Sequence, residues 1–139
     1  MTPLVQRNRN RGKAGERWLR DQLDAAGVKD PKRVGTMGGE DVRGYVGGNL
    51  WCFEFKGSMP GISKLVRALE QCREAAVKAK ANFCCAFARK KAGSTEVLAC
   101  TTYRELASLQ PESDLKVIVL AEDMLRLLGM ANNGKDDNR

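Results

Sequence analysis

Residues 41–56, which read DVRGYVGGNLWCFEFK, decide the fold because their pattern predicts a β-hairpin. Apolar and polar residues alternate along the second half of the stretch, as they do in a strand that buries one face. Gly47 and Gly48 suit a two-residue turn, because hairpin turns need positive φ angles, which glycine adopts without strain. Such a turn pairs Val46 with Asn49 and fixes every other pair of the hairpin by counting.

This register gathers charged side chains on one face of the hairpin. Asp41 stands opposite Glu54, and Lys56 lies two residues farther along the strand on the same side. A three-residue loop with a bulge would instead turn Asp41 to the apolar face, and Glu40 would then compete for its role. With the two-residue turn, the charged face holds Asp41, Arg43, Cys52, Glu54 and Lys56, and the core face holds Val42, Trp51, Phe53 and Phe55.

Two carboxylates and an amine at this spacing form a candidate site for phosphodiester hydrolysis. Opposed like charges destabilise a hairpin unless a cation lies between them, and Mg²⁺ binds through one or two carboxylates plus a substrate phosphate. There it would polarise the phosphate and activate a water, while Lys56 would hold that water or stabilise the developing charge. An isolated Glu-x-Lys pair is more often two charges on a solvated strand. The conjunction with Asp41, the glycine-rich stretch before it and Glu16 on a preceding basic helix favours the catalytic interpretation.

Composition narrows the classes of function. The chain of 139 residues contains no histidine, which excludes Ser-His-Asp and Cys-His catalysis and His-based nucleases. Its five cysteines include no C-x-x-C pair, and we expect them to be small core residues in a reducing compartment. No apolar run has the length of a membrane span, and the N-terminus lacks the apolar segment of a secretory signal. We therefore expect a cytoplasmic protein with no membrane role.

Positive charge is concentrated near the N-terminus, and the formal net charge of the chain is +7. Such a cluster favours nucleic acid, because each neutralised phosphate releases condensed counterions; a solvated basic tail is the alternative. The candidate phosphate-binding residues of this cluster are Arg7, Arg9, Arg11, Lys13, Arg17 and Arg20. On a later helix, Lys64, Arg67 and Gln71 are further candidates for the same groove. The alternative is that these three residues form a solvated helix face.

The remaining periodicity predicts a single α/β domain at residues 12–130, preceded by a flexible basic arm at 1–11 and followed by a disordered tail at 131–139. Besides the hairpin, apolar spacing predicts helices at 13–26, 63–81, 102–109 and 122–128. Apolar spacing and turn residues predict strands at 33–37, 82–89, 96–101 and 116–120. A helix throughout 115–128 is the alternative to the last strand and helix.

The order of these motifs resembles the PD-(D/E)XK nuclease superfamily, and within it the archaeal-type Holliday junction resolvases and their phage-encoded relatives. The matching residues are Glu16, then Gly38-Gly39-Glu40-Asp41, then Phe53-Glu54-Phe55-Lys56-Gly57-Ser58, within about residues 10–105. The resemblance implies a restriction-endonuclease-like α/β core (αβββαβ) with a mixed central sheet flanked by helices. This chain departs from the literal Pro-Asp form, because Glu40 precedes Asp41.

The resemblance also implies a role for each matching residue. Asp41 and Glu54 would bind the metal together with the main-chain carbonyl of Phe55. Lys56 would be the catalytic lysine, Glu16 would be the helix-borne acid that supports the metal site, and Thr36 would contact DNA from the loop where relatives often place a hydroxyl.

Three hypotheses of function follow. The first is Mg²⁺- or Mn²⁺-dependent cleavage of branched DNA by a homodimer, since a resolvase must cut two strands; in a phage-encoded protein this would occur in the host cytoplasm. The second is a restriction or repair nuclease of the same fold that acts on linear duplex. The third is a nucleic-acid-binding module without catalysis, which predicts salt-sensitive binding and no metal-dependent strand scission.

Overall fold

The structure is a computed structural model that describes residues 3–34, 41–58, 61–119 and 121–137, with side chains from residue 13 to residue 132 within these ranges. The chain divides into two units, Met1–Leu109 and Gln110–Arg139. The first unit contains the sheet and every candidate site residue, whereas the second contains the helix α4 (Ala121–Asp137). The extent of the domain predicted at 12–130 therefore stays a prediction.

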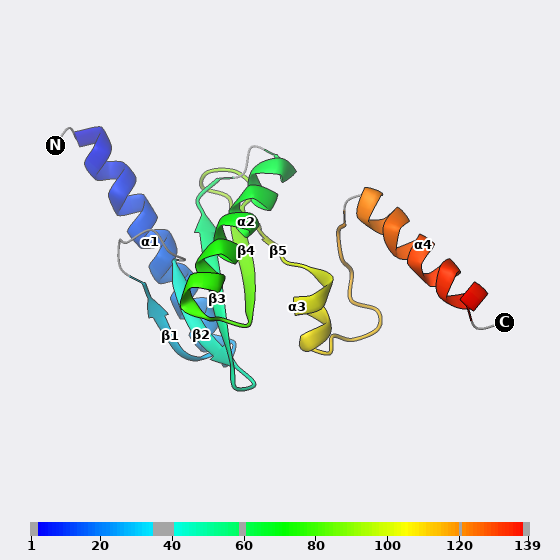
Figure 1. Cartoon of the computed structure of the whole chain (residues 1–139). Coiled ribbons are helices and arrows are strands. Elements are labelled where there is room, and N and C mark those ends of the chain that lie inside the picture. The colour runs from blue at the N-terminus through cyan, green and yellow to red at the C-terminus, as the bar shows by residue number, and fades with distance from the viewer. Residues whose placement is uncertain (1–2, 35–40, 59–60, 120, 138–139) are drawn as a thin grey trace. The chain divides into compact units, whose positions relative to one another are not determined.

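The first unit is built on one five-stranded mixed sheet (Figure 1). Its strands follow one another in chain order: β1 (Lys29–Arg33), β2 (Val42–Val46), β3 (Asn49–Lys56), β4 (Phe83–Arg89) and β5 (Val97–Cys100). All neighbours are antiparallel except β3 and β4, which are parallel and are joined by the helix α2 (Ile62–Ala79). The prediction of an α/β fold with a mixed sheet flanked by helices is thereby confirmed.

The hairpin of β2 and β3 has the register that its turn predicts. Val46 pairs with Asn49 at one end and Val42 pairs with Phe53 at the other. Gly47 has a φ of 56° and Gly48 a φ of 81°, and an L-amino acid with a side chain would be strained at both. Beyond Val42, the Asp41 N–H also donates a hydrogen bond to the Phe53 carbonyl at 3.0 Å. The paired residues end at Val42 and Phe53, so the placement of Asp41 across from Glu54 stays a prediction.

The helix α1 (Pro3–Ala25) covers the predicted core face of this hairpin (Figure 1). The helix comes closest at Gly15, where a Cβ atom would lie 2.5 Å from the ring of Phe55, so only glycine fits at this distance. The cluster that α1 closes contains Leu19, Leu23, Val42, Trp51, Phe53, Phe55 and Cys85. The core face was therefore predicted correctly.

The helix α2 packs against part of the opposite face, which holds Arg43 and Cys52 as predicted. Cys52 is fully buried there against Cys72, Ala76 and Cys84. A parallel strand pair needs a crossover connection, which lays its helix on the sheet and buries both faces. At the end of β3, Glu54 is 8% exposed and the Lys56 side chain is 33% exposed.

Several element boundaries differ from the predicted ones. The helix α1 begins at Pro3 instead of residue 13, because proline is well placed in a first turn and the following Gln and Arg residues are good helix formers despite their lack of an apolar stripe. Edge strand β1 starts at Lys29 and includes Pro31, which an irregular edge tolerates. Residues 35–37 of the strand predicted at 33–37 lie outside the described residues. Residues 116–119 form no strand, and α4 continues to Asp137 into the predicted tail.

A buried acid joins three elements beside β4. Glu105 on the helix α3 (Tyr103–Ser108) is fully buried and accepts hydrogen bonds from the Cys84 N–H at 3.3 Å and from the Thr102 hydroxyl. It also forms an ion pair with Arg73 of α2. The acid thereby fastens α2 and α3 to β4.

Candidate active site

The candidate site is centred on Asp41, at the point where the ladder between β2 and β3 ends. Its Oδ2 atom accepts a hydrogen bond of 2.7 Å from the main-chain N–H of Phe55. The Asp41 carboxylate thus accepts the main-chain hydrogen bond from β3 that a backbone carbonyl would accept if β2 continued. Because the N–H and C=O of a strand residue point to the same edge, the Phe55 carbonyl faces the same side as Asp41.

Glu16 brings a second carboxylate to this point from α1. It is held by Arg33 of β1, whose Nη2 and Nε atoms lie 3.1 and 3.3 Å from the Glu16 Oε2 atom. The pKa of Asp41 is raised above its ordinary value, first by burial and further by the negative charge and hydrogen bonding of Glu16, against the lowering effects of the Phe55 N–H and Lys56. Glu16 therefore lies close enough to oppose the ionisation of Asp41.

Lys56 interacts electrostatically with both Asp41 and Glu54. Its Nζ atom lies 3.5 Å from Glu54 Oε1, with side-chain exposures of 33% for the lysine and 10% for the acid. The positive charge of Lys56 also acts on Asp41. Of the four residues predicted as catalytic, Glu16 and Lys56 thus act on Asp41, and Lys56 also pairs with Glu54. They come from α1, the residue before β2 and the end of β3.

The fit of this site to a metal ion rests on the chemistry of its donors. Within the described ranges, no three or more His, Cys, Asp and Glu side chains form a group that could hold an ion by themselves. A Mg²⁺ site needs fewer protein ligands, because the ion keeps waters and binds substrate phosphate. Asp41 offers a carboxylate that is hard to ionise beside Glu16, which is the conflict that a divalent cation would relieve.

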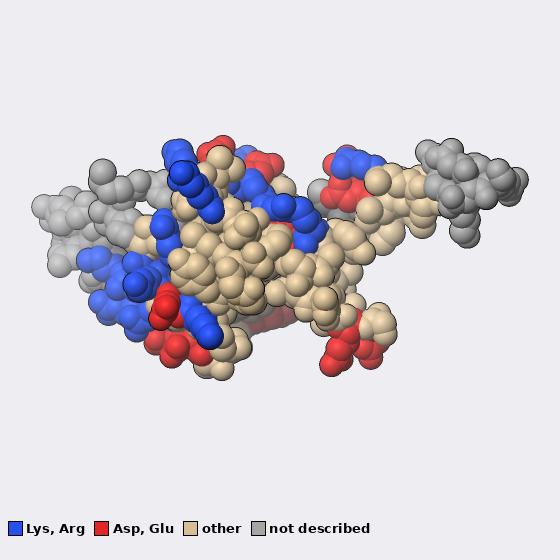
Figure 2. Space-filling view, turned by 60° about the horizontal axis from the view of Figure 1, so that its bottom comes forward, with Lys and Arg blue, Asp and Glu red and all other residues tan. Residues whose placement is uncertain are grey.

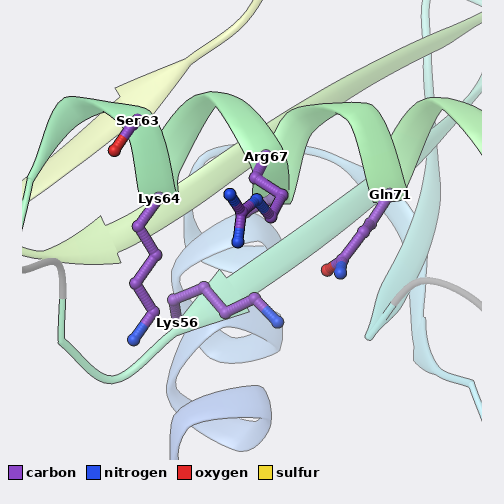
Figure 3. Close-up of a pocket in the computed structure, with 6 residues that line it drawn as sticks. Lys56, Ser63, Lys64, Arg67 and Gln71 are labelled. Atoms are coloured by element: carbon purple, nitrogen blue, oxygen red, sulfur yellow. The ribbon is translucent and has the colours of Figure 1, made fainter.

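The predicted phosphate-binding residues fall into three groups. Lys64, Arg67 and Gln71 line one pocket together with Lys56 (Figure 3). On α1, the side chains of Lys13, Arg17 and Arg20 are exposed, and Arg20 pairs with Asp21 at 3.0 Å. On the face shown in Figure 2, lysine and arginine side chains form several groups, with acidic side chains among them. The side chains of Arg7, Arg9 and Arg11 lie outside the described residues, as do Thr36 and the competing acid Glu40.

Two arginines near the site were not predicted from the sequence. Arg33 holds Glu16, and Arg89 at the end of β4 lies over the rings of Trp18 and Phe55, with its Cζ atom 5.2 and 5.6 Å from their centroids. These contacts join residues far apart in the chain, and no local spacing signals them. Trp18 packs beside Phe55 at 5.6 Å between ring centroids, which agrees with its predicted core role.

The raised pKa of Asp41 predicts that its ionisation destabilises the folded protein. A folded-state pKa above the ordinary value of 3.8 means that stability from this group is present at lower pH and is lost as the pH rises through the folded value. Asparagine stays neutral and can still accept the Phe55 N–H. We expect Asp41→Asn to melt at a higher temperature than the wild type at pH 7 without metal, with the difference disappearing in acid.

Thermal unfolding at several pH values measures this effect. Asp21→Asn is the matched control, because the Asp21 side chain is 65% exposed and its pair with Arg20 is a surface contact worth little. A melting temperature for Asp41→Asn below that of the wild type at pH 7 would contradict the proposed conflict between Asp41 and Glu16.

None of the helices in the described part of the chain has both the length and the apolar character needed to cross a membrane. In comparisons with known proteins, the chain matches no family model, no curated protein and no solved structure.

Proposed function

We propose that this protein is a metal-dependent DNA endonuclease with a restriction-endonuclease-like core. The observation that carries the proposal is that Asp41 interacts with both Glu16 and Lys56, and that Lys56 also pairs with Glu54. The order of elements α1, β1, β2, β3, α2, β4 corresponds to the αβββαβ core that the resemblance implies.

In this proposal each of the candidate site residues has a separate role. Asp41, Glu54 and the Phe55 carbonyl would hold Mg²⁺ or Mn²⁺, and the Arg33 guanidinium keeps Glu16 in place to support them. When bound, the ion supplies a Lewis acid for the phosphate and lowers the pKa of water. Lys56 donates a hydrogen bond to the attacking water or to the phosphate oxygen on which charge develops.

The proposed substrate is branched DNA, with a four-way junction as the model and a homodimer as the active form. Both follow from the resemblance to junction resolvases and from the need to cut two strands. A restriction or repair nuclease on linear duplex has the same site chemistry. Only a panel of substrates separates the two, so the test includes both.

Metal removal is the direct test of the proposal. We expect cleavage of a labelled four-way junction in Mg²⁺ or Mn²⁺, no cleavage in EDTA, and weaker cleavage of matched linear duplex. Because an ion that binds only the folded state stabilises it by mass action, Mg²⁺ is also expected to raise the melting temperature of the wild type but not of Asp41→Asn.

Two outcomes would count against this proposal in different ways. Salt-sensitive DNA binding with no metal-dependent scission would leave only a binding module. Faster cleavage of linear duplex than of the junction would keep the nuclease but replace the resolvase by a restriction or repair enzyme.

A further inference from the structure

A pocket of about 340 Å³ lies between the first half of α2 and the end of β3. Its lining contains three cationic side chains, a hydroxyl and an amide, and no acidic residue. In Figure 3 the labelled side chains of α2 project from one side of the helix toward Lys56. The lining residues are Lys56, Ser63, Lys64, Arg67, Ala68 and Gln71.

Helical geometry explains why these side chains converge. Lys64, Arg67 and Gln71 are three and four residues apart, so they stand above one another on one side of α2. Ala68 is 1% exposed and packs in the same cluster as Ala86 and Ala88 of β4, which keeps this part of the helix close to the sheet. The small side chain leaves room for the longer ones around it.

The pocket adjoins the proposed catalytic residues through Lys56. This lysine lines the pocket, and its Nζ atom also lies 3.5 Å from Glu54 Oε1. A ligand in the pocket would therefore lie next to a phosphate bound at the catalytic residues. A chain of regularly spaced phosphates can occupy both places at once.

We propose that this pocket binds a backbone phosphate of the DNA adjoining the phosphate that is cut. The inference rests on the proposed function and adds a subsite to it, with Arg67 and Lys64 as its charged ligands and Gln71 and Ser63 as neutral donors. Arginine suits such a site because its planar fork can donate two hydrogen bonds to one phosphate. The contact fixes the position of the strand and reads no base.

The helix itself offers a matched control for this subsite. Lys78 lies eleven residues after Arg67 on α2, which is three helical turns and thus the same side of the helix, but it does not line the pocket. Replacing either residue by alanine removes one positive charge from the same helix face. The pocket predicts that only Arg67→Ala has a specific effect.

The first experiment measures binding without catalysis. In an Asp41→Asn background without metal, the affinity for duplex DNA is followed across a series of salt concentrations by fluorescence anisotropy. We expect Arg67→Ala to reduce the slope of log affinity against log salt by about 0.9, which is the loss of one phosphate contact on duplex DNA. Lys78→Ala is expected to leave the slope unchanged, and equal slopes for the two variants would overturn the subsite.

The second experiment locates the phosphate. Single phosphates on either side of the cut are replaced by neutral methylphosphonates, and kcat/KM for cleavage is measured. We expect one neighbouring position to lower wild-type kcat/KM about tenfold, as the loss of one charged contact does. The same replacement should have little effect with Arg67→Ala, while Arg67→Lys restores part of the sensitivity.

The two experiments separate failure of the subsite from failure of the proposed function. Cleavage with the same methylphosphonate profile in the wild type and Arg67→Ala would overturn the subsite and leave the endonuclease intact. A specific loss of salt slope in Arg67→Ala, in a protein that never cleaves, would support the phosphate pocket and overturn the nuclease.

Discussion

Replacing Lys56 by alanine is expected to lower the rate of DNA cleavage at saturating substrate by about 10²–10³-fold, the usual effect of removing one donor to developing charge. Lys56 is 33% exposed and lies 3.5 Å from Glu54, so its ammonium group is available to the substrate and oriented by an acid. The measurement is single-turnover cleavage of the four-way junction in Mg²⁺, with Asp41→Asn assayed in parallel.

Folding and binding must be measured beside the rate, because Lys56 also lines the pocket on α2. The variant is expected to keep the wild-type melting temperature and to bind the junction, with affinity reduced by no more than one phosphate contact. Lys78→Ala removes a positive charge that lies outside both the proposed active site and the pocket on α2, so it should cleave at the wild-type rate. Full activity in both Lys56→Ala and Asp41→Asn would eliminate the proposed active site.

Replacing Glu105 by alanine is expected to lower the free energy of unfolding by about 3–5 kcal/mol, a large part of the stability of a small domain. The change leaves the Cys84 N–H without its acceptor and Arg73 without its ion partner. Burial alone would raise the pKa of Glu105, but hydrogen bonds from Thr102 and Arg73 outweigh it and lower the pKa below its usual value. Its stabilisation is therefore present above the unfolded pKa and is lost as the pH falls through the folded value.

Urea unfolding of the wild type and the variant at pH 7 and at pH 4 measures the loss of unfolding free energy and its dependence on pH. Glu96→Ala is the surface control, because its pair with Lys90 has side-chain exposures of 59% and 62% and should contribute at most about 1 kcal/mol. The difference between wild type and Glu105→Ala should shrink in acid. Equal midpoints for Glu105→Ala and Glu96→Ala at pH 7 would show that the buried acid does not fasten the helices.

The hairpin could be predicted from the sequence because its structure is determined locally. A turn at Gly47 and Gly48 sets the register of two adjacent segments, and side-chain alternation then follows. The cover over Cys52 could not be predicted in the same way, because it depends on where α2 crosses the sheet. The polar start of α1 carries no apolar periodicity, so its helical structure was missed as well.

In the candidate site, too, the contacts within the hairpin could be predicted and the contacts between distant segments could not. The prediction that Asp41 stands across from Glu54 follows from counting along the hairpin, whose register from Val42 to Val46 is as predicted. The resemblance supplied the role of Glu16, whereas its partner Arg33 became apparent only in the folded structure. Long-range ion pairs follow no spacing rule along the chain, so only the folded structure reveals them.

The parallel pairing of β3 with β4 has a consequence for synthesis on the ribosome. The hairpin can close within microseconds once residue 56 has emerged, but the strand that completes its other side is made only after α2. Until then the apolar segment Leu50–Phe55 presents an unpaired edge, which is a template for joining other nascent chains. We therefore expect fast elongation through α2, or a chaperone bound to the emerging segment, to improve the yield of correctly folded protein.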